Sequence, residues 1–141
     1  MTEPGLVVKI EFLADLDDVA DHITVSFDGC ESLGAINLRG TGFAAREWTL
    51  QAITSTVEGR MATAQLRVAT LPAYLLAKIH AAQGRNLPKD WYDIAYVLVH
   101  FDDGGPSQAA RLTVDRFGKD LVAATETAIG ELLANFADAA A

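Results

Sequence analysis

Residues 71–98, LPAYLLAKIHAAQGRNLPKDWYDIAYVL, contain two apolar helical runs separated by the short break Arg-Asn-Leu-Pro. Leu and Ile recur at helical spacing in the first run. Pro72 suits the first position of one helix and Gly84 its end, and Pro88 suits the start of the next helix, which we expect to reach about Phe101. This stretch constrains the fold most, because two apolar helices so close in sequence must bury their faces in one core.

Five charged side chains lie within this apolar stretch, namely Lys78, Arg85, Lys89, Asp90 and Asp93. A charge among apolar residues is costly to bury unless it is paired or binds a ligand. Lys78 lies at the margin of the apolar face, and Arg85 follows two turns later on the same side. Two cations on one side of a helix suit a phosphate or a carboxylate, although both side chains could instead extend to water.

The two aspartates follow the break between the helices. Asp90 fits the first turn of the second helix, where the helix dipole favours a carboxylate. Asp93 lies deeper in an apolar helix and therefore needs a cationic partner, for which Lys78 and Arg85 are the candidates. We expect Lys78, Arg85, Asp90 and Asp93 to converge in one polar pocket between the two helices.

Several other side chains of these segments are predicted to be structural. The second helix is apolar on nearly every side, which is typical of a buried helix. We interpret Trp91, Tyr92 and Tyr96 of this helix as core residues, and we interpret Trp48 of the earlier segment 46–57 in the same way. His80 lies opposite the apolar stripe of its helix and is predicted to be at the surface.

The residues before position 70 favour strands. Leu6–Leu13 and His22–Phe27 are rich in branched residues, and Ile36–Arg39 reads as a brief strand or turn. Arg46–Val57 and Met61–Ala69 flank the turn signal Glu58-Gly59-Arg60 and predict an antiparallel hairpin.

The residues after 101 favour a loop at 102–106, a short helix at Ser107–Leu112 and a long helix from about Val114 to Ala137. Strands first and helices later indicate an α+β fold, with an N-terminal mixed or antiparallel sheet followed by a C-terminal helical bundle. We expect one domain over 1–141, with 1–70 mainly β and 71–141 mainly α.

Composition excludes several classes of protein. Hydrophobic residues make up 50% of the 141 residues, which is not the composition of a disordered chain. The net charge of −8 argues against a large nonspecific nucleic-acid footprint. The single cysteine, Cys30, supports a reducing, cytoplasmic setting. No signal peptide or apolar run of about 20 residues is present, so we expect no membrane partner. Walker A, G-x-G-x-x-G and G-x-S-x-G motifs are also missing from the sequence.

The segments LLAKIHA (75–81), Arg85 and KDWYDI (89–94) resemble the AbiEii/AbiGii-type nucleotidyltransferase-like proteins, in which an apolar helix with a Lys is followed by an Arg and a Lys/Arg-Asp-x-x-Asp helix. The resemblance covers residues 71–100 and, more loosely, the strands of 46–69. It implies a DNA polymerase β-like nucleotidyltransferase fold, of which this chain is the C-terminal portion. It also implies nucleotide transfer from an NTP onto RNA such as tRNA, by the toxin of a toxin–antitoxin pair.

The resemblance implies catalytic roles for Lys78, which approaches the nucleotide phosphates, and for Asp90. It implies that Arg85, Lys89 and Asp93 bind the nucleotide or support the site.

The chain departs from this family upstream of the helices. The family's catalytic centre is a Gly-Ser or Gly-Gly turn followed by an Asp-x-Asp pair, whose carboxylates hold the metal ions. No such turn precedes the first strand here, and Asp15-Leu16-Asp17 is interpreted as a solvated turn. The strand VVKIEFL resembles the strand that supplies a third carboxylate, which assigns Glu11 as a metal ligand.

One glutamate cannot hold two metal ions. We therefore expect a truncated or catalytically incomplete chain that is inactive alone and uses Mg²⁺ only when a missing N-terminal segment or a partner chain completes the site. The alternatives are a non-catalytic nucleotide-binding or assembly domain, and an interaction protein whose charged residues form a structural salt bridge. A sheet without its neighbouring layer would expose apolar surface, so we expect a homodimer or a heteromer, with an antitoxin among the possible partners.

Overall fold

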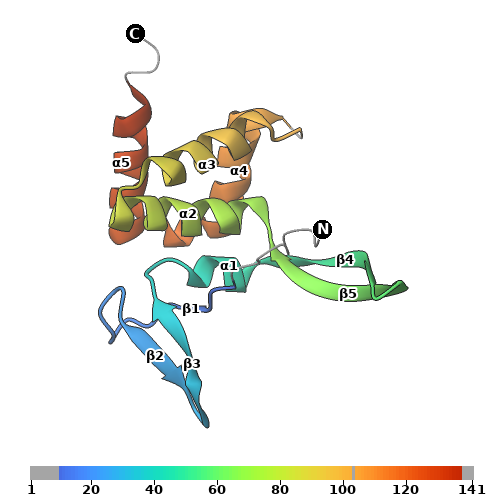
Figure 1. Ribbon diagram of the computed structural model, residues 1–141. Coiled ribbons are helices and arrows are strands. Elements are labelled where there is room, and N and C mark those ends of the chain that lie inside the picture. Colours follow the sequence, from blue (N-terminus) through green and yellow to red (C-terminus); the bar gives the residue numbers. More distant parts are fainter. Residues whose placement is uncertain (1–9, 103, 138–141) are drawn as a thin grey trace. The chain divides into compact units, whose positions relative to one another are not determined.

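The computed structural model describes residues 10–102 and 104–137, and Figure 1 shows the order of their helices and strands. Strands precede a helical C-terminal region, which confirms the predicted α+β class. The chain divides into two compact units between Arg39 and Gly40. The assignment of 1–141 to one domain stays a prediction.

The first unit contains a three-stranded mixed sheet with the order β1-β3-β2. Its strands are β1 (Leu13–Ala14), β2 (Thr24–Phe27) and β3 (Cys30–Asn37). β1 pairs with β3 in parallel, and β2 pairs with β3 antiparallel. The turn Asp28-Gly29 joins β2 to β3, and Gly29 supplies the positive φ that this tight turn requires.

Two strand predictions in the first unit need correction. The strand expected over Leu6–Leu13 begins outside the described residues, and within them only Leu13 belongs to β1. The brief strand expected at Ile36–Arg39 is the end of the eight-residue β3. Sequence pattern missed most of β3 because Gly34 lies within it, where the chain passes so close to the side chain of Thr24 that a Cβ would not fit.

Asn37 organises the loop that follows β1, and the sequence alone did not indicate this role. It is 1% exposed, and its Nδ2 donates hydrogen bonds to the carbonyl oxygens of Leu16 (3.1 Å) and Val19 (2.7 Å). Its Oδ1 accepts a hydrogen bond from the Leu16 amide at 2.8 Å. One buried amide therefore satisfies several backbone groups of the loop. Asp15 and Asp17 in this loop are exposed, as predicted for a solvated turn.

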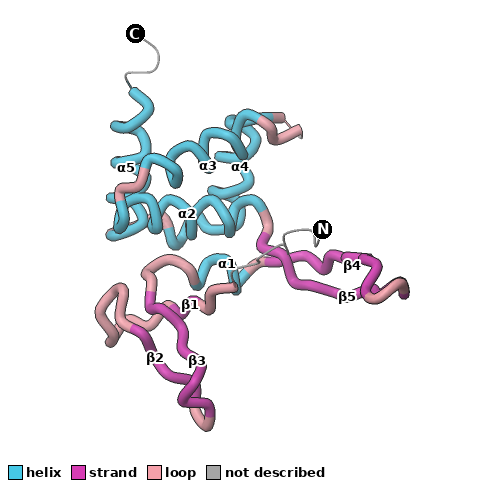
Figure 2. Tube along the Cα trace, in the orientation of Figure 1, coloured by secondary structure: helices cyan, strands magenta, loops and turns pink. Residues whose placement is uncertain are grey.

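The second unit begins with a short helix and a long hairpin. Helix α1 spans Gly42–Arg46, and strands β4 (Trp48–Val57) and β5 (Arg60–Ala69) pair antiparallel over their whole length. Glu58 and Gly59 both have positive φ, which matches the right-handed twist of a two-residue hairpin loop. The predicted hairpin is confirmed. Figure 2 shows its two strands in magenta, and within the described part of the chain they form a separate two-stranded sheet.

Helices make up the rest of the second unit. They are α2 (Leu71–Arg85), α3 (Pro88–Val99), α4 (Gly105–Phe117), the 3₁₀ helix η1 (Gly118–Asp120) and α5 (Ala124–Ala137). Helix α2 packs on α1, α3, α4 and α5, and its residues Leu75, Leu76 and Ile79 are central to the core. No helix among the described residues is long and apolar enough to cross a membrane.

Several predicted helix boundaries are wrong, and α4 begins at Gly105 rather than at Ser107. The break expected near Thr113 lies instead between α4 and α5, at 118–123. Thr113 lies inside α4, where its buried hydroxyl donates a hydrogen bond to the Ala109 carbonyl oxygen at 2.9 Å. Helix α2 ends at Arg85 rather than Gly84, because Asn86 adopts the left-handed conformation that closes it.

Candidate functional site

Helices α2 and α3 place five charged side chains in one cluster, which we call the charged cluster: Lys78, Arg85, Lys89, Asp90 and Asp93. The helices form an antiparallel pair because Leu87 and Pro88 follow directly after the Asn86 cap. The short connection brings the last turn of α2 beside the first turn of α3. The structure therefore brings together all five residues that the sequence singled out in this stretch.

Asp90 lies at the centre of the charged cluster. Its side chain is 4% exposed, and its Oδ1 accepts hydrogen bonds from Lys78 Nζ at 2.7 Å and from Arg85 Nη2 at 3.0 Å. Its other oxygen, Oδ2, is buried and has no hydrogen-bond partner among the described residues. One buried carboxylate therefore fixes the positions of two cations from the preceding helix.

Asp93 forms the outer part of the charged cluster. Its Oδ2 lies 2.8 Å from Lys78 Nζ and 2.9 Å from Lys89 Nζ. The Lys89 pair is an i, i+4 contact along α3, and the Lys89 side chain is 79% exposed. Lys78 thus bridges both aspartates. The predicted cationic partner of Asp93 is Lys78, one of the two candidates, and Lys89 is a second partner that was not predicted.

Both sides of this bridge favour the charged forms. Burial alone would lower the pKa of Lys78, but hydrogen bonds to Asp90 and Asp93 and the attraction of the two carboxylates raise it overall. Hydrogen bonds from Lys78 and then Lys89 lower the pKa of Asp93. The charged cluster contains three basic and two acidic side chains, so its formal charge is positive.

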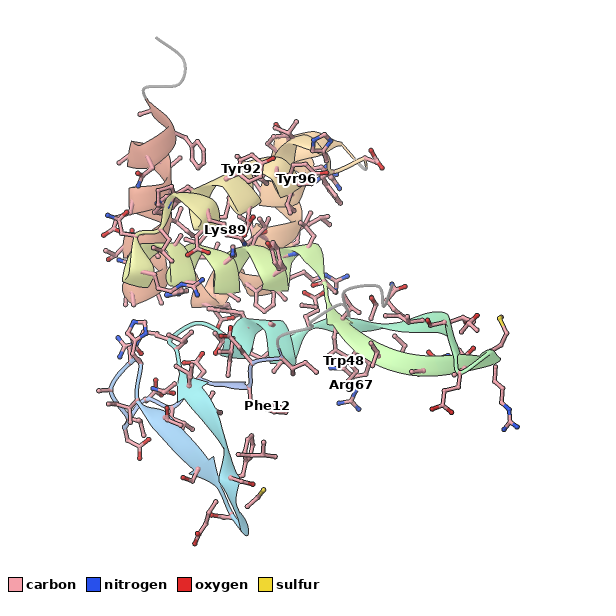
Figure 3. All side chains as sticks on the ribbon, in the orientation of Figure 1. Phe12, Trp48, Arg67, Lys89, Tyr92 and Tyr96 are labelled. Atoms are coloured by element: carbon pink, nitrogen blue, oxygen red, sulfur yellow. The ribbon has the colours of Figure 1, made fainter. Side chains whose placement is uncertain are left out.

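An open aromatic groove of about 480 Å³ lies next to the charged cluster, lined by Tyr74, Tyr92, Asp93, Tyr96 and Val97. Tyr92 and Tyr96 are 65% and 52% exposed. Figure 3 labels both tyrosines on α3, after Lys89. The prediction that these tyrosines are core residues is wrong, because the core takes the opposite side of α3 at Ile94.

The remaining core predictions have mixed outcomes. Trp91 packs partly buried against the core, as expected, but Trp48 is 37% exposed at the base of the hairpin. The Arg67 guanidinium lies over the Trp48 ring, with its Cζ 4.2 Å from the ring centroid (Figure 3). His80 was expected at the surface and is 7% exposed instead. Its Nε2 lies 3.1 Å from Thr125 Oγ1, and its ring stacks on Phe43, so α1 and α5 cover a helix face that its own sequence left polar.

Glu11 lies in the first unit, in an exposed segment just before β1. No group of three or more His, Cys, Asp or Glu side chains within 10–102 and 104–137 is arranged to hold a metal ion. These residues therefore do not fit the carboxylate set of a two-metal centre. Glu11 as a metal ligand and Mg²⁺ as a cofactor stay predictions.

The model of one protein family, described as "Nucleotidyl transferase AbiEii toxin, Type IV TA system", matches residues 4–140. No curated protein and no solved structure matches the chain.

Proposed function

The chain belongs to the AbiEii nucleotidyl transferase toxin family of type IV toxin–antitoxin systems, and from that premise we propose that its charged cluster binds the phosphate groups of a nucleoside triphosphate. The observation that carries the proposal is the geometry around Asp90. This buried carboxylate holds Lys78 and Arg85 on one oxygen, at 2.7 and 3.0 Å, so both cations are positioned before any ligand arrives. Binding to prepositioned groups avoids much of the entropy cost of ordering long side chains.

The charges of the cluster suit a polyphosphate. Three cations face two carboxylates, and the exposed Lys89 can turn from Asp93 toward an incoming phosphate oxygen. Lys78 stays protonated over the working pH range because its pKa is raised. An ammonium group acts as a point charge on a phosphate, whereas the planar guanidinium of Arg85 can donate two parallel hydrogen bonds.

Within this proposal Lys78 and Asp90 take the central roles, and Arg85, Lys89 and Asp93 support them. We propose an RNA acceptor, tRNA among the candidates, on the strength of the family resemblance. An antitoxin is a plausible partner for a member of a toxin–antitoxin family. No step through a metal ion is assigned to the described residues, because their carboxylates do not form a metal-binding group.

A second candidate function is that the chain binds nucleotide without transferring it. It is favoured because the carboxylates of the described residues form no metal-binding group. Incubation of the full chain with labelled NTP, Mg²⁺ and total RNA distinguishes the two. Label transfer to RNA would support the transferase, whereas nucleotide binding without transfer would support the binding domain.

Calorimetric titration of ATP, CTP, GTP and UTP into the full chain tests phosphate binding. A charge-assisted hydrogen bond is worth about 1.5–3 kcal/mol, so we expect Lys78→Ala to weaken binding roughly 10- to 100-fold. Lys89→Ala should weaken it less, and because its side chain is exposed this variant keeps the fold intact. Lys119→Ala, which removes an exposed lysine in η1, is the matched control. Equal affinities in the wild type, Lys78→Ala and Lys119→Ala would reject the proposal.

The β4–β5 hairpin supports a further element of the proposal, namely a homodimer. Isolated two-stranded hairpins are marginally stable in water, yet Leu50, Ile53 and Leu66 are 46–60% exposed here. Strand β4 contains no charge, proline or bulge over ten residues, and these are the usual devices that protect a sheet edge. We propose that β4 pairs with β4 of a second copy.

Light scattering on the wild type and on Ile53→Lys tests this pairing. We expect a dimer at micromolar concentration that the lysine shifts to monomer. A wild-type chain that stays monomeric, or that associates only with an added antitoxin, would contradict the homodimer.

A further inference from the structure

We infer that the aromatic groove beside the charged cluster binds the base of the nucleoside triphosphate. The inference rests on the proposed function, because it assigns the base of the same ligand whose phosphates the charged cluster would hold. Nucleotides are bound in proteins by two unlike surfaces, a cationic one for the phosphates and an aromatic one for the base. The structure has one of each side by side, built from α2 and α3.

Three aromatic rings follow one another along one face of α3 and its C-cap residue, His100. The ring centroids of Tyr92 and Tyr96 are 6.0 Å apart with an angle of 32° between the ring planes. Those of Tyr96 and His100 are 4.3 Å apart with an angle of 45°. Tyr92 and Tyr96 are more than half exposed, so a flat ligand can reach their faces. Base-on-aromatic stacking tolerates any base because every base has a π face.

Asp93 joins the groove to the charged cluster. It lines the groove, and its Oδ2 is within hydrogen-bond distance of the ammonium groups of Lys78 and Lys89. A ligand in the groove therefore has two cations at its rim. A base on Tyr96, joined through its ribose to phosphates at Lys78 and Lys89, satisfies both surfaces at once. Asp93 is also placed to accept a hydrogen bond from a sugar hydroxyl or an exocyclic amine.

The charges favour a nucleotide over the other ligands that such a groove could take. Tyrosines around a carboxylate also suit an organic cation such as a quaternary ammonium. Here, however, Lys78 and Lys89 neutralise Asp93 and would repel a cation at the rim. A purely apolar ligand would displace water from these ammonium groups and offer them no hydrogen-bond acceptor in return. A flat aromatic group that carries negative charge at one end fits both parts.

A comparison of ATP with inorganic tripolyphosphate tests the inference, because the two ligands share the phosphate chain but only ATP has a base. We expect the full chain to bind ATP roughly 5- to 100-fold more tightly than tripolyphosphate. Tyr96→Leu should remove most of this difference and leave the affinity for tripolyphosphate unchanged. Tyr92→Leu serves as a second variant. Phe136→Leu, which removes a partly exposed aromatic side chain of α5, is the matched control.

A second measurement needs no variant. Nuclear Overhauser contacts between the protons of the ATP base and those of the tyrosine rings should appear in the wild type. Equal affinities for ATP and tripolyphosphate, or contacts only to rings outside the groove, would overturn the inference. Binding of a short single-stranded RNA through Tyr96, without binding of ATP, would assign the groove to the acceptor and would also overturn it.

The inference and the proposed function can fail separately. If Lys78→Ala weakens both ligands but Tyr96→Leu weakens neither, the groove has no role and phosphate binding stands. If Tyr96→Leu weakens ATP but Lys78→Ala has no effect, the groove binds the base and the charged cluster does not bind the phosphates. If neither ligand binds the wild type, both are rejected.

Discussion

Lys78 Nζ lies 2.7 Å from Asp90 Oδ1, and this contact crosses from α2 to α3 at a point where the Asp90 side chain is 4% exposed. Twelve residues separate the two in sequence. The pair holds the two helices together, and it also fixes the ammonium group that we propose for phosphate binding. Its removal should therefore affect stability as well as ligand affinity, and the two effects can be measured independently.

Asp90→Ala should lower the free energy of unfolding by about 3–5 kcal/mol, the usual cost of removing one partner from a buried ion pair. The reason is that Lys78 and Arg85 would both lose the buried carboxylate that they share. Urea denaturation measures the change. Asp115→Ala, which removes an exposed carboxylate of α4, should change it by less than about 0.5 kcal/mol. Equal effects of the two substitutions would show that Asp90 is not the centre of the charged cluster.

The stability of the charged cluster should depend on pH in the acid range. The folded state lowers the pKa of Asp93, so its contribution is present above the ordinary carboxyl pKa and is lost as pH falls through the folded value. Melting temperatures of the wild type should therefore fall between about pH 4 and pH 2 more steeply than those of Asp93→Asn. Parallel curves for the two proteins would contradict this.

The alkaline side has the opposite sign. The folded state raises the pKa of Lys78, so its contribution is complete below the ordinary lysine pKa and is lost as pH rises through the folded value. We expect Lys78→Met to lose less stability than the wild type above about pH 10.5. Chemical denaturation at pH 8 and pH 11 measures the difference, with Lys119→Met as the control. An identical loss in all three proteins would argue against a paired Lys78.

Gly40→Ala should destabilise the second unit by roughly 1–3 kcal/mol or more. Gly40 has a φ of +84°, and a Cβ at this position would overlap the buried ring of His80. Gly84→Ala is the matched control, because Gly84 lies inside α2 and a Cβ at this position would meet no atom within 4 Å. The control should stabilise the protein by about 0.5–1 kcal/mol. Thermal melting of both variants gives the sign of each stability change. A stabilised Gly40→Ala variant would contradict the close approach of Gly40 to His80.

Leu76→Ala should lower the free energy of unfolding by about 2–5 kcal/mol. The reason is that the Leu76 side chain of α2 is fully buried in the core. Leu133→Ala makes the same substitution at a side chain of α5 that is 67% exposed. We expect the second change to cost less than about 1 kcal/mol. Chemical denaturation compares them, and similar costs would mean that α2 is not at the centre of the core.

Local sequence signals predicted the elements that carry the charged cluster. Pro72 and Pro88 mark the starts of α2 and α3, and the Glu58-Gly59 turn marks the hairpin. The convergence of Lys78 with Asp90 could be predicted because the two helices adjoin in sequence. The position of Asp93 within an apolar helix also predicted a cation nearby, because a charge among apolar residues needs a partner.

Long-range packing was the part that sequence could not supply. His80 is buried because Phe43 and Thr125 cover it, and both are far from it in sequence. Tyr92 and Tyr96 look like core residues on hydrophobicity alone. Their exposure depends on which side of α3 the other helices occupy. The aromatic groove was missed for this reason, although the spacing of Tyr92, Tyr96 and His100 at four-residue intervals could have indicated it.

The ion pairs of Asp90 join residues that are five and twelve positions apart along the chain. Contacts of such low contact order close small loops at little entropic expense, so this helical hairpin is expected to form early in folding. The cations would then acquire their final arrangement before the more distant contacts of α5 are made. Mutations that slow the docking of α5 should consequently leave the kinetics of this hairpin nearly unchanged.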